Sequence, residues 1–238
     1  PLLSGRINDD ASFYKEMAEF LVVVVFNPND LSIPTAIINF AGVIYVPNGI
    51  NREGIFLQLN SGNWTDSPYY TNRLSILVTL FSFLQDFPTM KEFDMAFQSI
   101  RSNLSSIVNV ADKDIAYSYE VPTYDVKRRA PDRDGLLVGT NHFVDPSWGI
   151  PPPDDEKNGW TVTRRNNLLA LGEKYKGEFN VEKMKEVLDT TIENGGATSP
   201  SYTIYQIIAV PEELILWLKA PGNFEWQQVD LKRLFRKK

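Results

Sequence analysis

The sequence predicts an α+β fold in which two antiparallel sheets lie face to face and a pair of helices covers each, a four-layer αββα sandwich. Short runs of β-branched and aromatic residues, bounded by Gly, Pro and Asn, occur in groups. Two helical segments separate each group from the next, whereas strands alternating singly with helices would indicate a parallel sheet. Since no repeat or linker interrupts the order, we expect residues 1–238 to form a single domain.

Four strands are expected before the first helix pair. The run Leu21–Phe26 (LVVVVF) is continuous and apolar, which is typical of a buried strand, and a polar turn follows it. The other three are expected at residues 34–40, 42–46 and 55–59, with a turn at residues 47–49.

After these strands, the spacing of apolar residues changes to the period typical of helices. Residues 70–87 are expected to form a helix that stops at Pro88, and residues 89–101 a second one, opened by a capping box of Thr89 and Glu92. Later helices are expected at residues 161–175 and 181–193. The remaining strands are expected at residues 106–110, 115–121, 124–128, 136–139, 202–210, 214–219 and 224–229. The Pro- and Asp-rich residues 145–159 are interpreted as a connection between elements more than as a lid.

Composition excludes several functions. The net charge of −6, with acidic and basic residues interleaved, argues against nucleic-acid binding, which needs a basic face. The absence of cysteine removes disulfides and thiolate metal sites, and a single histidine, His142, cannot build a His-rich metal site. No apolar run is long enough to span a bilayer. We therefore expect no metal, no cofactor and no membrane span, while the compartment (cytoplasmic, periplasmic, secreted or lysosomal) stays open.

Five short motifs occur in an order that resembles one family. These are Gly5-Arg6-Ile7-Asn8-Asp9, Gly49-Ile50-Asn51-Arg52-Glu53-Gly54, Leu59-Asn60, Thr140-Asn141-His142-Phe143 and Thr161-Val162-Thr163-Arg164. They resemble motifs of the N-terminal-nucleophile (Ntn) hydrolases, in the branch of choloylglycine hydrolase, penicillin acylase and acyl-CoA:6-aminopenicillanate acyltransferase. The resemblance covers nearly the whole chain and implies the αββα sandwich.

The resemblance implies a catalytic role for five residues. Asp9 would orient the α-amine of the nucleophile, and Arg6 would stabilise its thiolate. Asn60 and Asn141 would donate N–H groups to the tetrahedral oxyanion, and Arg164 would brace the carboxylate.

Each of these residues also has a structural interpretation. Arg6 and Asp9 could form a surface ion pair, Asn60 could end a strand, Asn141 could lie in a turn, and Arg164 could be an exposed charge on a helix. For Asn51 a turn is the favoured interpretation.

The sequence departs from the family at its start. The family nucleophile is a cysteine, exposed as the N-terminus by autoproteolytic processing, on a strand that precedes the Gly-Arg segment. Here Arg6 comes so early that this strand has no residues available, and Ile7 replaces an expected asparagine. Three explanations are open: an N-terminal piece outside the given sequence, a nucleophile on a separate polypeptide, or a relative that binds its ligand without hydrolysing it.

Two functions follow from the resemblance. The first is hydrolysis or acyl transfer at the carbon–nitrogen bond of a linear N-acyl amide, a small molecule such as a bile-salt conjugate, a penicillin, an N-acyl amine or an acyl peptide. The second is a catalytically silent protein that holds an apolar acyl ligand. A homo-oligomer is compatible with both.

Overall fold

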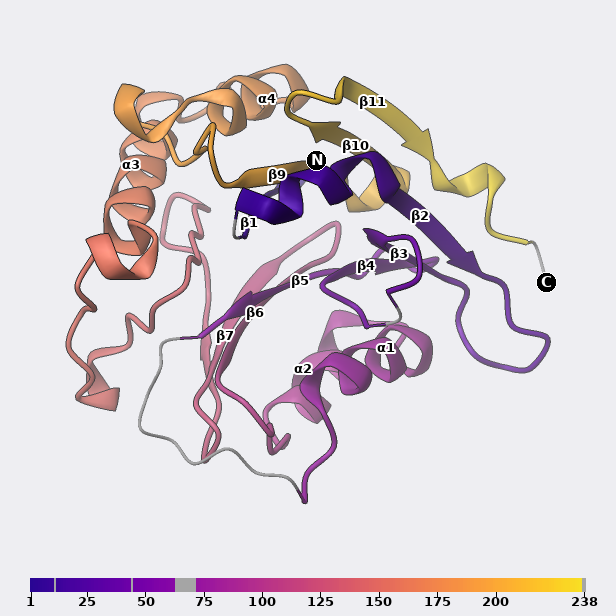
Figure 1. Ribbon diagram of the computed structural model, residues 1–238. Helices are drawn as coiled ribbons and strands as arrows, with labels where there is room; N and C mark the ends of the chain where they lie inside the picture. The colour runs from indigo at the N-terminus through magenta and orange to yellow at the C-terminus, as the bar shows by residue number, and fades with distance from the viewer. Residues whose placement is uncertain (11, 44, 63–71, 237–238) are drawn as a thin grey trace.

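A computed structural model gives the fold of residues 1–10, 12–43, 45–62 and 72–236. Its strands form two antiparallel sheets, as predicted (Figure 1). The four-stranded sheet has the order β1-β9-β10-β11, with β1 at Ser4–Asp9, β9 at Thr203–Val210, β10 at Ile215–Ala220 and β11 at Phe224–Asp230. The seven-stranded sheet runs β2 to β8 in chain order. Its strands are Leu21–Phe26, Thr35–Phe40, Asn48–Asn51, Phe56–Ser61, Ser106–Ala111, Ala116–Val121 and Lys127–Arg129.

Helix pairs cover the outer faces of the two sheets. Helices α1 (Ile76–Asp86) and α2 (Met90–Phe97) pack on the seven-stranded sheet, and α3 (Thr161–Lys174) and α4 (Val181–Asp189) lie beside β1 and β9 (Figure 1). Short 3-10 turns join the elements at Ser12–Phe20, Pro146–Trp148, Glu156–Asn158, Ile192–Asn194, Pro211–Glu213 and Leu231–Arg233. None of the helices in the described residues is both long and apolar enough to cross a membrane.

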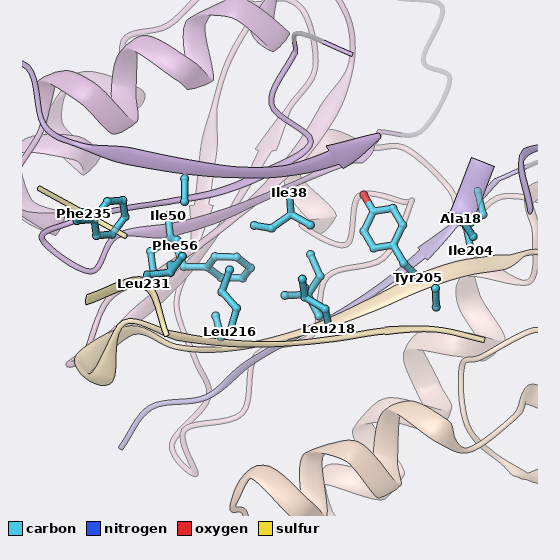
Figure 2. Close-up of a cluster of buried hydrophobic side chains, with 14 residues drawn as sticks. Ala18, Ile38, Ile50, Phe56, Ile204, Tyr205, Leu216, Leu218, Leu231 and Phe235 are labelled. Atoms are coloured by element: carbon cyan, nitrogen blue, oxygen red, sulfur yellow. The ribbon is translucent and has the colours of Figure 1, made fainter. Parts of the chain in front are cut away.

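Two apolar cores hold the layers together. The first lies between the sheets, where Ile38, Phe56, Tyr205 and Leu216 are buried together (Figure 2). The second lies between the seven-stranded sheet and α1–α2, where Leu80, Phe93 and Phe97 pack against inner strands. Strand β3 is buried on both faces, and accordingly its residues Ala36 to Ile38 are apolar without a break instead of alternating with polar residues.

The capping box predicted for α2 is confirmed. The Thr89 hydroxyl accepts from the Glu92 backbone N–H at 3.3 Å and donates to the Glu92 carboxylate at 2.6 Å. Helix α1 begins at Ile76, where the Ser75 side chain caps it, so the expected start at residue 70 was too early; residues 70 and 71 lie outside the described part. Helices α2 and α4 end four residues before their predicted ends, at Phe97 and Asp189.

Three local predictions were wrong. The described residues of 42–46 form a turn instead of a strand, and the next strand, β4, occupies the residues expected to turn. Gly49 is needed in β4 because a Cβ there would lie 2.6 Å from the Leu84 side chain of α1. Residues 136–139 form no strand; Gly139 instead lies against the side chain of Asn109, which would be 2.5 Å from a Cβ. Strand β1 was not predicted as a strand from its own residues.

Candidate active site

The five candidate residues come from four separate segments and line one cavity of about 470 Å³. Arg6 and Asp9 lie on β1, and Asn60 lies near the end of β5. Asn141 lies in the loop after β8, and Arg164 in the first turn of α3. The fold therefore brings together residues up to 158 positions apart in the sequence (164 − 6). Their catalytic roles stay predictions.

Arg164 connects two of the other candidates. Its Nη1 donates to Oδ2 of Asp9 at 2.7 Å, and its Nη2 donates to Oδ1 of Asn141 at 2.9 Å. The side chains are only 10% exposed for Arg164 and 19% for Asp9, so this is a buried ion pair and not a charge on an exposed helix face. The second Asp9 oxygen accepts from the Thr203 hydroxyl at 2.6 Å. Both carboxylate oxygens are therefore held, which fixes the orientation of Asp9.

The backbone conformation at the start of α3 directs the Arg164 side chain toward Asp9. Gly159 and Trp160 both adopt left-handed backbone conformations, with φ of 64° and 59°, so the chain turns sharply into the helix. The Asp155 carboxylate then accepts from the backbone N–H groups of Val162 at 2.7 Å and Thr163 at 2.9 Å. A carboxylate at this end of a helix also interacts favourably with the helix dipole.

Arg6 lies on the inner side of the site, between the two sheets. Its Nη2 donates to the Leu59 carbonyl and to Oδ1 of Asn8, both at 3.0 Å. Burial lowers the pKa of its guanidinium from the ordinary value, and the neighbouring Tyr205 and Asp9 act in the opposite direction. Its Nε is buried and has no hydrogen-bond partner among the described residues. The group therefore places a donor, and positive charge, beside the cavity.

Each of the two asparagines donates a hydrogen bond to the backbone of the segment that carries the other. Asn60 Nδ2 donates to the Thr140 carbonyl, and Asn141 Nδ2 donates to the Ser61 carbonyl, each at 3.1 Å. Each amide nitrogen carries two hydrogens, so one N–H of each remains for a ligand. Asn51, in contrast, is fully buried away from the cavity, where it closes the β4–β5 turn by accepting from the Ile55 N–H. That agrees with the favoured interpretation of Asn51 as a turn residue.

His142 has a structural position behind the site. It is 5% exposed, and its Nδ1 lies 3.1 Å from the Thr161 hydroxyl and 3.2 Å from that of Thr140. Burial, and then the positive charge of Arg165, lower the pKa of His142 to about 4, so the imidazole is neutral at neutral pH. The Thr161 hydroxyl also accepts from the Asn141 backbone N–H at 2.8 Å, which links His142 to the position of Asn141.

A buried carboxylate, Glu120, holds the loop that follows Asn141. It accepts from the backbone N–H groups of Val144 and Asp145, at 2.8 and 3.2 Å, and from the Trp148 indole N–H at 2.8 Å. Its charge is compensated by Arg129, whose Nε lies 3.0 Å away. The roles of Glu120, Thr203 and Asp155 were not predicted from the sequence. Only Asp155, an acidic residue shortly before a predicted helix, carried a signal that could have been recognised.

A larger cavity of about 800 Å³ adjoins the first. The two share lining residues that include Gly5, Gln58 and Leu188. The start of the chain, Pro1 to Gly5, lines the larger one, together with many apolar side chains of α3, α4 and β7. No cluster of three or more potential metal ligands occurs in the described ranges.

Three solved structures to which this chain is similar in fold are amide hydrolases. An N-acylethanolamine-hydrolyzing acid amidase ortholog from Caenorhabditis elegans superposes with a TM-score of 0.63 at 18% identity, over 88% of this chain and 87% of that one. Penicillin V acylase from Agrobacterium tumefaciens gives 0.66 at 11% identity, over 97% and 83%. A variant of conjugated bile acid hydrolase from Clostridium perfringens gives 0.64 at 12% identity, over 97% and 89%. Neither a family model nor a curated protein matches the sequence.

These similarities show the fold. The chain has the sandwich of two antiparallel sheets with flanking helices found in these Ntn hydrolases, and the fold expected from the resemblance is confirmed.

Proposed function

We propose that the protein hydrolyses the amide bond of a linear N-acyl compound, using a nucleophile that belongs to a strand outside the 238 residues. The observation that carries the proposal is the convergence of Arg6, Asp9, Asn60, Asn141 and Arg164 on one cavity. Together they offer a fixed carboxylate, buried positive charge and amide N–H donors, which are the groups that acyl transfer from an amide requires. The fold shared with amide hydrolases of three substrate types supports it.

The open edge of β1 suggests where the nucleophile strand would lie. In the described part of the chain, β1 pairs with β9 only, and its first residues line the larger cavity. An unpaired strand edge is a template for a further strand. The N-terminal residue of a strand bound along β1 would lie near Arg6 and Asp9. The chain has no cysteine, so a thiol nucleophile has to come from such a segment.

The proposed reaction uses the groups in turn. Asp9 holds the terminal ammonium of the nucleophile residue, and the Arg6 charge favours its thiolate. The thiolate attacks the carbonyl carbon, and the developing oxyanion accepts hydrogen bonds from the free N–H groups of Asn60 and Asn141. The amine leaves with a proton from the α-ammonium group, and water then hydrolyses the thioester to release the carboxylic acid.

A second candidate function is binding of an apolar acyl ligand without hydrolysis. The observation that favours it is the absence of cysteine combined with the large, mainly apolar cavity beside the site. In that case Asn60 and Asn141 would bind the amide carbonyl, and no bond would break.

A reconstitution assay separates the two. The full chain is incubated with fluorogenic N-acyl amides, together with a synthetic peptide that begins with Cys or a matched peptide that begins with Ala. Hydrolysis that depends on the Cys peptide, and that Asn141→Ala suppresses, is the expected result. The opposite result would be saturable binding of the amide without turnover, both with either peptide added and in protein from its natural source. That result would refute hydrolysis and favour binding of an acyl ligand as the function.

A further inference from the structure

Strand β2 leaves an open edge on the seven-stranded sheet. It is the outermost strand, and β3 is its one neighbour in the described residues (Figure 1). The Ala41 N–H donates to the Phe20 carbonyl at 2.9 Å, so Phe20 and Ala41 form a hydrogen-bonded pair. This pair determines which residues of β2 direct their backbone groups toward β3. Because hydrogen-bonded pairs alternate in antiparallel sheets, Val22, Val24 and Phe26 bond to β3. The backbone N–H and C=O groups of Leu21, Val23 and Val25 therefore point outward.

This edge lacks the protection that the edges at β8 and β11 have. Strand β8 is short and all its residues are basic, Lys127 to Arg129. Strand β11 carries Glu225, Gln227, Gln228 and Asp230. Charges and polar side chains of this kind prevent edge strands from pairing with other chains. Strand β2 has six residues, LVVVVF, none of them charged or proline, so its edge remains competent to pair.

We propose that β2 is a dimerisation edge, at which β2 of one copy pairs antiparallel with β2 of a second copy. In the register that places Val23 opposite Val23, Leu21 lies opposite Val25. All three residues of each copy then have outward backbone groups, so each N–H meets a carbonyl across a twofold axis. The two seven-stranded sheets become one continuous sheet.

The side chains on this edge favour a second copy as the occupant. In the same register Phe20 lies opposite Phe26 of the second copy, and these rings are 52% and 38% exposed. Aromatic pairs across neighbouring strands are stabilising. No like charges meet, because residues 20–26 contain none. Phe26 also packs edge-on against Phe81 of α1, with 4.9 Å between the ring centroids, so its ring is already oriented.

Sedimentation velocity of the full chain over a wide concentration series tests the proposal. The wild type is expected to reach a species of twice 27.1 kDa. Val24→Lys places a charge on a 38% exposed edge residue, opposite Val22 of the second copy and diagonal to that copy's own introduced lysine, and should weaken dimerisation about tenfold or more. Met95→Lys, an equal change at a 66% exposed residue of α2, is the matched control and should leave the dimer intact.

Amide hydrogen exchange on the wild type gives a second readout that needs no variant. The amides of Leu21, Val23 and Val25 should become more protected as concentration rises through the dimerisation range. A wild type that stays monomeric, a dimer insensitive to Val24→Lys, or exchange at these amides that does not change with concentration would overturn the proposal. None of these outcomes bears on hydrolysis, so the proposal and the proposed function fail separately.

Discussion

The ion pair between Asp9 and Arg164 makes the sharpest prediction about the site. Removing one partner of a buried ion pair costs about 3–5 kcal/mol, because the other charge is left uncompensated. Asp9 would keep its hydrogen bond from Thr203, and both side chains retain some contact with solvent. We therefore expect Arg164→Gln to lower the free energy of unfolding by about 2–3 kcal/mol. For a domain of this size that corresponds to a fall in Tm of roughly 4–12 °C.

A double-mutant cycle with Asp9→Asn measures the coupling directly. We expect a coupling free energy of at least about 1.5 kcal/mol from denaturant unfolding. The control cycle uses Asp154 and Lys157, whose atoms are 2.8 Å apart but whose side chains are 51% and 81% exposed. That pair should couple by less than about 0.5 kcal/mol. Equal coupling in the two cycles would refute the argument that burial makes the Asp9–Arg164 pair strong.

Three further predictions concern Asn141 and two buried residues that support its loop. Asn141→Ala should lower kcat about 100- to 1,000-fold in the reconstituted hydrolysis assay with little change in Tm; a large fall in Tm with unchanged turnover would assign Asn141 a structural role only. Glu120→Gln should lower stability by at least about 2 kcal/mol, because an amide cannot accept from all the donors that face the carboxylate; Trp148 fluorescence should shift with it, and a wild-type spectrum and Tm would contradict this. On acidification the unfolded chain takes up the His142 proton near pH 6.5 and the folded chain only near pH 4, so stability should fall between these values, by about 2 kcal/mol after allowance for solvent screening. His142→Gln should show a shallower Tm-versus-pH slope there, and parallel slopes would argue against a buried neutral imidazole.

Much of the fold could be predicted from local sequence. The run at β2, the capping box at Thr89 and the grouping of strands around helix pairs each depend on residues close together in the chain. The errors arose where a distant contact decides the conformation. Gly49 looks like a turn residue, but the close approach of Leu84 from α1 makes a glycine necessary within a strand.

The site could be predicted in part, and only through the resemblance. Motif order suggested Arg6, Asp9, Asn60, Asn141 and Arg164 as a set, and the fold brings them to one cavity. Local sequence carried no sign of which pairs would touch. The contacts of Asp9 with Thr203 and of Glu120 with the loop after Asn141 join segments separated by many residues, so no local pattern marks them.

The central claim is that the cavity works with a nucleophile from outside the 238 residues. Intact-mass spectrometry of the protein from its natural source, denatured after treatment with a thiol-alkylating reagent, tests it most directly. Because the chain has no cysteine, any alkylated product has to include another segment. We predict an alkylated small polypeptide, or an alkylated chain heavier than 27.1 kDa, whose modification abolishes amide hydrolysis. A single unmodified species of 27.1 kDa would contradict the claim.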